Sequence, residues 1–340
     1  MKYTATQSGL MLVKLINLIV IVFTILLSVQ PVEASDSLFF LESQFVLGYS
    51  STKAELEYYS FSYNHPMQKP SLGFDYLHRF SSDYGDRIIL ALQGRIAWNN
   101  MFQNNFETQV YNAYIRGKLG FADIWFGHSR PAFGLSSYLD THAHLLQNLS
   151  MEGFGYDRDW GAGLYKVYNN GDINLSLTSG SGMPFISEGN YLINLRTAYG
   201  VIERDNFNIG LSIGFGNTAD FMGYHRMNPG LSRTVLTGID CSYFVNNHEF
   251  RLESVIGDMQ NDYVHGFLFR YGINFFDENR LKIEFQPVLE KTAGQNEFFK
   301  FYTAVTFIIN EYLTLRSMYN YSQATGDGKI ICQLYLYKII

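Results

Sequence analysis

Alternation of apolar and polar residues is the dominant pattern along this chain. It is clearest in 206–216, where every second residue is apolar and the residues between are Asn, Ser or Gly. The apolar positions are Phe207, Ile209, Leu211, Ile213 and Phe215. Successive side chains of a strand point to opposite faces, so this period of two predicts a strand with one apolar and one polar face.

The same reading along the whole chain gives sixteen candidate strands. They run over 38–49, 70–80, 85–98, 105–118, 121–128, 159–168, 171–179, 190–203, 206–216, 233–246, 248–257, 263–276, 280–290, 297–309, 311–321 and 328–339. Segment 53–62 is also strand-like, so counts of fourteen and eighteen stay open beside sixteen.

Short turns and longer connections mostly alternate between these strands. The short turns lie at 81–85, 119–120, 169–170, 204–205, 247, 277–279 and 310. The longer connections lie at 50–69, 99–104, 129–158, 180–189, 217–232, 258–262, 291–296 and 322–327. Membrane barrels have an even number of antiparallel strands, short turns at one end and longer loops at the other. The sequence therefore predicts an all-β fold, a transmembrane antiparallel up-and-down β-barrel of about sixteen strands.

The polar face of several strands is charged, which favours a wet lumen. In 280–290, Leu281, Ile283 and Phe285 alternate with charged residues that include Lys282 and Glu284. A soluble sandwich would bury these charges at high cost. We therefore expect the apolar faces to point to lipid and the polar faces to point inward.

Composition narrows the class of protein further. The chain of 340 residues is 16% aromatic and 16% charged, with a net charge of -6. A mean hydropathy of -0.06 argues against a bundle of membrane helices, and the acidic balance argues against nucleic-acid binding. Cys241 and Cys332 lie in two well-separated predicted strands, so two free thiols are favoured, and their pairing stays open.

The N-terminal segment has the form of an export signal. Lys14 precedes an apolar run at 15–29, and Val32-Glu33-Ala34 has the small-residue pattern of a cleavage site. The run is shorter than the roughly 20 residues of a membrane-spanning helix. We predict a signal peptide over 1–34, cleaved after Ala34, and one barrel domain over 35–340; an uncleaved anchor is the alternative.

The longest connection, 129–158, carries a resemblance. The stretch WFGHSRPAFG at 125–134 and the DWG at 159–161 resemble segments of the general and phosphate-selective porins. In those families a strand ends in Gly-Arg, a Pro-Phe-Gly turn follows, and a long third loop folds inward and narrows the channel. Here His128 replaces the usual Arg and Ala132 separates Pro131 from Phe133, so phosphate selectivity is not implied.

The resemblance implies an outer-membrane protein of a Gram-negative bacterium that is exported through the periplasm. Outer-membrane lipid, the barrel-assembly machinery and small solutes or ions would be its partners, and a homotrimer is one of the expected assemblies. Small polar or charged solutes would diffuse passively through a loop-constricted lumen, with no cofactor and no enzymatic activity. The alternatives are a non-conducting structural or surface barrel plugged by 129–158 and, less favoured, a barrel hydrolase.

Alternation assigns a set of charges to the pore. The basic residues expected to face the lumen are Arg87, Arg95, Arg116, Arg196, Arg251, Lys282 and Arg316. Asp140, Glu152 and Asp157 lie in the inward loop. A basic wall opposite an acidic loop would set up a transverse field and select ions or dipolar solutes. A mixed, unselective lumen is the alternative.

The loop also contains Asp140-x-His142-x-His144. Residues two apart share a face in an extended chain, and three such ligands suit zinc. The sequence supplies no general base or supporting hydrogen-bond partners around them, so we expect no metal site and keep His142 and His144 as weak candidates only.

Overall fold

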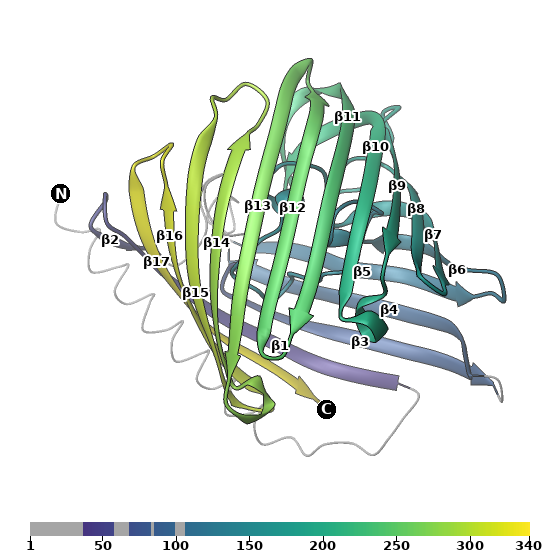
Figure 1. Cartoon of the computed structure of the whole chain (residues 1–340), viewed down its shortest axis with the longest axis horizontal. Coiled ribbons are helices and arrows are strands. Elements are labelled where there is room, and N and C mark those ends of the chain that lie inside the picture. The colour runs from purple at the N-terminus through teal and green to yellow at the C-terminus, as the bar shows by residue number, and fades with distance from the viewer. Residues whose placement is uncertain (1–36, 58–67, 83–84, 99–105) are drawn as a thin grey trace.

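The computed structural model describes residues 37–57, 68–82, 85–98 and 106–340 (Figure 1). The predicted signal peptide therefore lies outside the described residues, as do parts of the connections predicted at 50–69 and 99–104. No helix in the described ranges has the length and apolar character needed to cross a membrane.

The fold is a closed antiparallel barrel of sixteen long strands with one additional short strand (Figure 1). Its strands are β1 Ser37–Ser50, β2 Glu55–Glu57, β3 Ser71–Ser82, β4 Gly85–Trp98, β5 Phe106–Lys118, β6 Asp123–Ser129, β7 Asp159–Tyr168, β8 Gly171–Thr178, β9 Tyr191–Tyr199, β10 Phe207–Met222, β11 His225–Val245, β12 His248–Met259, β13 Asp262–Phe275, β14 Leu281–Lys291, β15 Phe298–Asn310, β16 Leu313–Ser322 and β17 Asp327–Ile339. Short helical turns are η1 Leu135–Ser137, η2 Leu149–Glu152, α2 Ile202–Asp205 and η3 Asp277–Asn279.

Strand β1 closes the barrel by pairing on both sides. It pairs with β17 from Phe40↔Ile339 to Ser50↔Lys329, and with β3 from Ser37↔His78 to Gln44↔Ser71. The three-residue β2 adds to β1 beyond β3. Closure removes free sheet edges, so every long strand satisfies its backbone hydrogen bonds on both sides.

The two faces of the wall have opposite polarity, as the alternation predicts. On β10 the outward Leu211 is 57% exposed, whereas the adjacent inward Ser212 is 1% exposed. The same outward exposure of large apolar side chains recurs on strands all around the barrel. Apolar residues outside and polar residues inside are the reverse of a soluble protein and match a barrel that faces lipid.

Each of the sixteen predicted strands overlaps one long strand of the barrel, and the count of sixteen is confirmed. Two connections were predicted wrongly as long. Segment 217–232 is mostly strand, because β10 and β11 continue as a paired hairpin to Met222 and His225. The β12–β13 connection is a tight turn in which Gln260 and Asn261 both have positive φ, the geometry of two-residue hairpin turns.

The longest connection and several of the short turns lie at opposite ends of the barrel. The turns after β7, β11 and β15 each have two residues, and they lie at the end where β1 begins and β17 finishes. The long connection between β6 and β7 starts from the other end. Cys241 and Cys332 are both free thiols and stand on separate strands.

Candidate functional site

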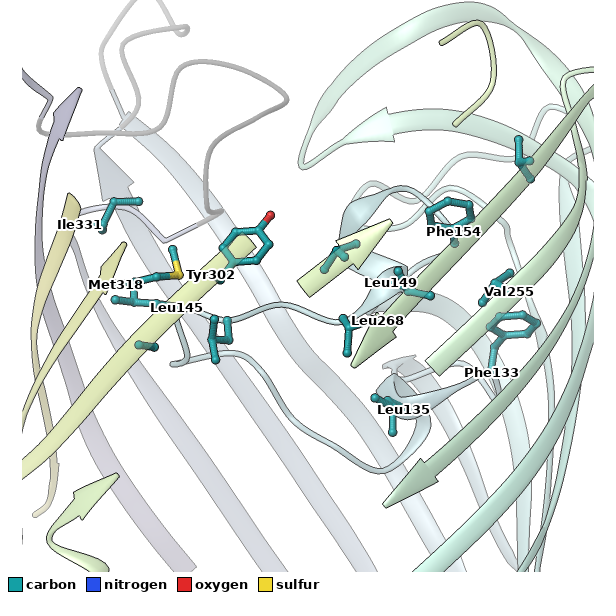
Figure 2. Close-up of a cluster of buried hydrophobic side chains, with 14 of the residues drawn as sticks. Phe133, Leu135, Leu145, Leu149, Phe154, Val255, Leu268, Tyr302, Met318 and Ile331 are labelled. Atoms are coloured by element: carbon teal, nitrogen blue, oxygen red, sulfur yellow. The ribbon is translucent and has the colours of Figure 1, made fainter. Parts of the chain in front are cut away.

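The connection between β6 and β7, residues 130–158, packs inside the barrel. Its apolar side chains Leu135, Leu149 and Phe154 are fully buried and belong to one cluster with inward residues of the wall (Figure 2). The wall residues of this cluster include Val255, Val264, Leu268, Val288, Met318 and Ile331. Most of the inner wall is polar, and these apolar wall residues are the exception. The apolar side chains of the segment pack against them.

Inward glycines let two rings approach the wall. A Cβ on Gly266 would lie 2.9 Å from the Phe154 ring, and a Cβ on Gly238 would lie 3.4 Å from the Phe133 ring. Any larger residue at position 266 would push Phe154 away. Alternation shows only that these inward positions hold small residues. In the structure, the lack of a side chain at Gly238 and Gly266 allows the segment to pack directly against the wall.

Glu253 on β12 binds the backbone of the segment at two places. One carboxylate oxygen accepts the N–H of Leu135 at 2.9 Å and the other accepts the N–H of Leu149, also at 2.9 Å. These are the first residues of η1 and η2, whose leading N–H groups have no intrahelical partner. Because Glu253 is 1% exposed, its two bonds form away from bulk water and join both short helices to the wall.

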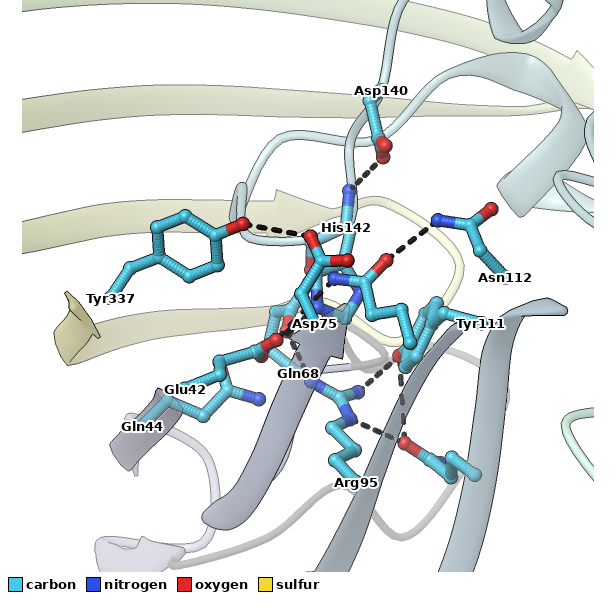
Figure 3. Close-up of polar contacts among 12 residues, drawn as sticks. Glu42, Gln44, Gln68, Asp75, Arg95, Tyr111, Asn112, Asp140, His142 and Tyr337 are labelled. Atoms are coloured by element: carbon cyan, nitrogen blue, oxygen red, sulfur yellow. Dashed lines mark hydrogen bonds and ion pairs between the residues drawn. The ribbon is translucent and has the colours of Figure 1, made fainter. Parts of the chain in front are cut away.

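A polar network holds the segment to the opposite side of the barrel (Figure 3). The Nε2 atom of His142 lies 2.8 Å from a carboxylate oxygen of Glu42 on β1, and the carbonyl of His142 accepts the side-chain amide of Gln68 at 2.5 Å. Arg95 on β4 donates to Gln109 at 2.6 Å and to the hydroxyl of Tyr111. The segment is thus fixed on β1 as well as on β12, across the lumen.

Arg158 belongs to the segment and pairs with two of the segment's own acidic residues, Asp140 and Asp157. Its guanidinium donates to both oxygens of Asp140 at 3.0 Å and to Asp157 at 2.8 Å. Burial opposes ionisation of Asp140, but the guanidinium groups of Arg158 and Arg130 hold the pKa of that carboxyl well below its usual range. Asp140 therefore stays charged and paired at any pH near neutral.

Glu152 is the acidic residue of the segment that pairs with a basic residue of the wall. Lys300 on β15 lies 2.5 Å from one Glu152 oxygen and 2.8 Å from Glu290 on β14, and Tyr302 donates to the other Glu152 oxygen at 2.9 Å. Two carboxylates thus share one ammonium.

Three of the basic residues predicted on the pore wall, Arg196, Arg251 and Lys282, are paired with acids of the same wall. Arg196 binds Asp240 at 2.6 Å and Asp172 at 3.2 Å, and its guanidinium stacks on the ring of Tyr138 from the segment. A second group joins β12 to β14, across the intervening β13. Its contacts are Arg251–Glu249 at 3.3 Å, Lys282–Glu249 at 2.9 Å and Lys282–Glu284 at 3.0 Å.

The remaining basic residues predicted to face the lumen also lie on the inner face of their strands. Arg116 stacks on Tyr114, Arg316 donates to Gln333 at 3.1 Å and stacks on Tyr335, and Arg87 shares the face of Arg95 but is exposed. The sequence predicted that basic residues of the wall would face acidic residues of the loop. That predicted arrangement of charges is wrong. Arg196, Arg251 and Lys282 pair with acids of the same wall because a charge in a partly dry interior needs a nearby counter-charge. Lys300 differs in that it pairs with an acid of the segment, Glu152, as well as with the wall.

The weak metal candidates are directed to different partners. The imidazole of His142 binds Glu42, and the carboxylate of Asp140 accepts from Arg158. Within the described residues, no group of three or more His, Cys, Asp or Glu side chains is placed to hold a metal ion.

The DWG segment has a structural role that its resemblance did not assign. The carboxylate of Asp159 accepts the backbone N–H groups of Gly180 at 2.6 Å and Gly182 at 3.1 Å, and the hydroxyl of Ser179 at 2.7 Å. Trp160 donates to the carbonyl of Met183 at 2.9 Å. The start of β7 therefore orders the β8–β9 connection.

Sequence reasoning missed Glu42, Arg158, Glu253 and Lys300 as residues that hold the segment. Glu253 lies at a position of its strand that faces inward, but no local pattern indicates that its partners are backbone groups more than a hundred positions away. Arg158 lies between two aspartates, Asp157 and Asp159, which is the one signal that could have marked it as an internal counter-charge.

Comparison with solved structures supports the architecture. No protein-family model and no curated protein matches this chain. The structure is similar to OmpF of Salmonella typhi in complex with daunomycin, with a TM-score of 0.65, 9% identity and coverage of 89% of this chain and 97% of that chain. An anion-selective porin from Comamonas acidovorans gives a TM-score of 0.60 at 10% identity, covering 89% of this chain and 100% of that one.

A loop-deletion mutant of OmpT, an outer membrane protein of Vibrio cholerae, gives a TM-score of 0.61 at 11% identity, with coverage of 89% of this chain and 99% of that chain. These identities establish the fold. The chain has the closed sixteen-strand antiparallel barrel of the porin type.

Proposed function

We propose that this protein is a pore of the bacterial outer membrane through which small polar or charged solutes diffuse passively. The observation that carries the proposal is the reversed polarity of the wall: apolar side chains cover the outside, and ion pairs such as Arg196–Asp240 line the inside. A wall of this kind is stable only with lipid on one side and a polar medium on the other. Several of the similar structures are described as porins.

In this proposal residues 130–158 form the constriction. The segment is held on β1 through His142, on β12 through Glu253 and on β15 through Glu152. Charged side chains of the inner wall, including Arg251, Lys282 and Arg316, would border the space that the segment leaves and would contact the passing solute. The loop is thus a fixed obstacle that sets the size limit.

The cellular setting belongs to the same proposal. Residues 1–34 would direct export, the barrel-assembly machinery would insert the chain, and outer-membrane lipid would cover the apolar surface. A homotrimer fits this class, since a trimer form is among the similar structures. The proposal assigns no reaction and no cofactor to the chain.

Single-channel recording tests the pore. The purified barrel is inserted into a planar bilayer under a salt gradient, and discrete conductance steps are expected. An inserted, folded barrel that stays silent would contradict the proposal.

A second candidate is a non-conducting surface barrel plugged by the same segment. It is favoured by the apolar contact of Leu149 and Phe154 with the wall, which fills part of the lumen without water. Deletion of 135–154 separates the two: a plugged barrel would conduct only after the deletion, whereas a constricted pore would conduct before it and more strongly after it.

A further inference from the structure

The β10–β11 hairpin reaches across the barrel at the end where the β6–β7 connection starts. The hydroxyl of Tyr224 at its tip accepts the backbone N–H of Val110 on β5 at 2.9 Å, although four strands separate β5 from β10 in the sheet. Gly223 and Met227 at the same tip border a hollow. The strand extension that the sequence did not predict therefore encloses space above the segment 130–158.

We call this hollow the vestibule; its volume is about 1550 Å³, open to solvent. Residues 150–158 form one side of it, and Met227 of the hairpin forms another. Lys69 and Tyr111 border it from the β3–β5 side, and Gly182 and Met183 border it from the β8–β9 connection. The rest of the wall comes from β12–β15 and their connections. Any solute that enters the barrel from this end meets the vestibule before the buried part of the segment.

The vestibule has a deformable apolar lining. Four of the ten methionines of the chain border it: Met151, Met183, Met227 and Met259. The rings of Phe221 and Phe298 also border it. Methionine side chains are flexible and polarisable and make favourable contacts with aromatic groups, so this lining suits apolar groups of varied shape. A channel that passes only small inorganic ions would not require a flexible, apolar lining of this kind.

The charge of the lining is negative. Its basic residues are Lys69, Arg158 and Lys300, and its acidic residues are Glu152, Asp157, Asp220 and Glu290. Each basic group is already paired: Lys69 with Glu107 at 2.7 Å, Arg158 with Asp157, and Lys300 with both glutamates. An anion would find no unpaired cation among these residues, whereas a cation would meet excess carboxylate.

Part of this excess negative charge lies at Glu290. This residue is 1% exposed, and its Oε1 accepts Lys300 at 2.8 Å. Its Oε2 has no hydrogen-bond partner among the described residues. A buried carboxylate oxygen without a donor is costly, and a ligand ammonium would supply both the donor and the missing charge.

We propose that the vestibule binds amphipathic organic cations, with a primary ammonium at the Glu290–Glu152 pair and the apolar part against the methionines. This inference rests on the proposed pore function and names the solute class that the entrance favours. Binding concentrates such solutes at the constriction and makes them blockers or preferred passengers according to their size.

The probe is phenethylammonium, compared with neutral phenethyl alcohol and anionic phenylacetate. Affinities are measured by isothermal titration calorimetry on the full barrel in lipid nanodiscs. We expect phenethylammonium to bind at least about tenfold more tightly than the alcohol, the equivalent of one charge-assisted hydrogen bond, and phenylacetate to bind more weakly than both. Replacement of both Met227 and Met259 by Ala should weaken the ammonium and the alcohol by a similar factor.

The variant Glu290→Gln should abolish the preference for phenethylammonium over the alcohol. Its matched control is Glu278→Gln, which removes the same charge from an exposed turn at the other end of the barrel. Equal affinities of the three probes for the unmodified barrel overturn the inference, and this comparison needs no variant to fold. An unchanged preference in a folded Glu290→Gln barrel overturns it as well.

Conductance recorded from the same preparation separates the two proposals. A barrel that conducts but shows no preference for the ammonium refutes this inference and leaves the pore intact. A barrel that binds phenethylammonium yet never conducts refutes the pore and leaves the site.

Discussion

The ammonium of Lys300 lies 2.5 Å from the carboxylate of Glu152, and this buried ion pair joins β15 to a segment 148 positions earlier in the chain. The same ammonium also neutralises Glu290. One wall residue therefore compensates two carboxylates, one on the wall and one on the segment that crosses the lumen.

Substitution of Lys300 by Met should destabilise the barrel strongly. It leaves Glu152 and Glu290 close together without a counter-charge, and removal of one partner of a buried pair costs about 3–5 kcal/mol. The measurement is the temperature at which the barrel loses its heat-modifiable migration on gels. Lys291→Met, which removes an ion pair to the exposed Asp262, is the control and should change this temperature little. Equal behaviour of the two variants would contradict the assignment.

Glu253→Ala should loosen the segment from the wall. Two backbone N–H groups, at Leu135 and Leu149, lose their acceptor, and each unsatisfied donor costs about 1–3 kcal/mol. Single-channel recording should show larger or noisier conductance steps, and protease added to the folded barrel should cut within 135–149. Glu253→Gln keeps one acceptor oxygen and should lie between. A segment equally resistant in all three proteins would show that Glu253 does not hold it.

Gly266→Ala should destabilise the folded barrel by about 1–3 kcal/mol, the usual cost of overpacking. The added Cβ would lie 2.9 Å from the Phe154 ring and 3.2 Å from Leu149. Gly230→Ala is the matched control, because no atom lies within 4 Å of a Cβ at that position. Urea unfolding followed by tryptophan fluorescence measures both variants, and a similar midpoint shift would argue against close packing at Gly266.

Charge reversal at Arg251 should shift ion preference toward cations. Arg251 lies on the inner face beside Glu249, at 3.3 Å, so Arg251→Glu adds negative charge where ions would pass. The reversal potential in a tenfold salt gradient is the readout. Arg280→Glu makes the same change at an exposed turn and should leave the potential unchanged. If neither variant alters it, Arg251 does not border the ion path.

The Asp140–Arg158 pair should be insensitive to pH across the neutral and mildly acidic range. The pKa of Asp140 is lowered in the folded protein, so its contribution is fully present above the unfolded pKa of about 4 and is lost only as the pH falls through the lower folded pKa. Protease resistance of the segment should therefore be constant between about pH 5 and pH 8, and Asp140→Asn should reduce it equally at every pH in that window. A loss of resistance near pH 6 that Asp140→Asn abolishes would contradict this.

The barrel was predictable because its signal is local. A strand shows its faces within a few residues, as Leu211 and Ser212 do, and no knowledge of distant partners is needed. The β10–β11 extension was missed because residues 217–232 mix apolar, polar and glycine residues without alternation, and their pairing comes from backbone hydrogen bonds that any side chain permits.

The sequence by itself favoured sixteen strands, and it determined the outward apolar face and the inward placement of the charged residues, because each follows from a period of two. Only the tertiary structure decided which charges meet. Glu42 and His142 are 100 positions apart, and the two backbone partners of Glu253 lie 118 and 104 positions before it. Closure of the barrel places these groups opposite one another, and their need for counter-charges and hydrogen-bond partners in a low-dielectric interior then sets the pairs.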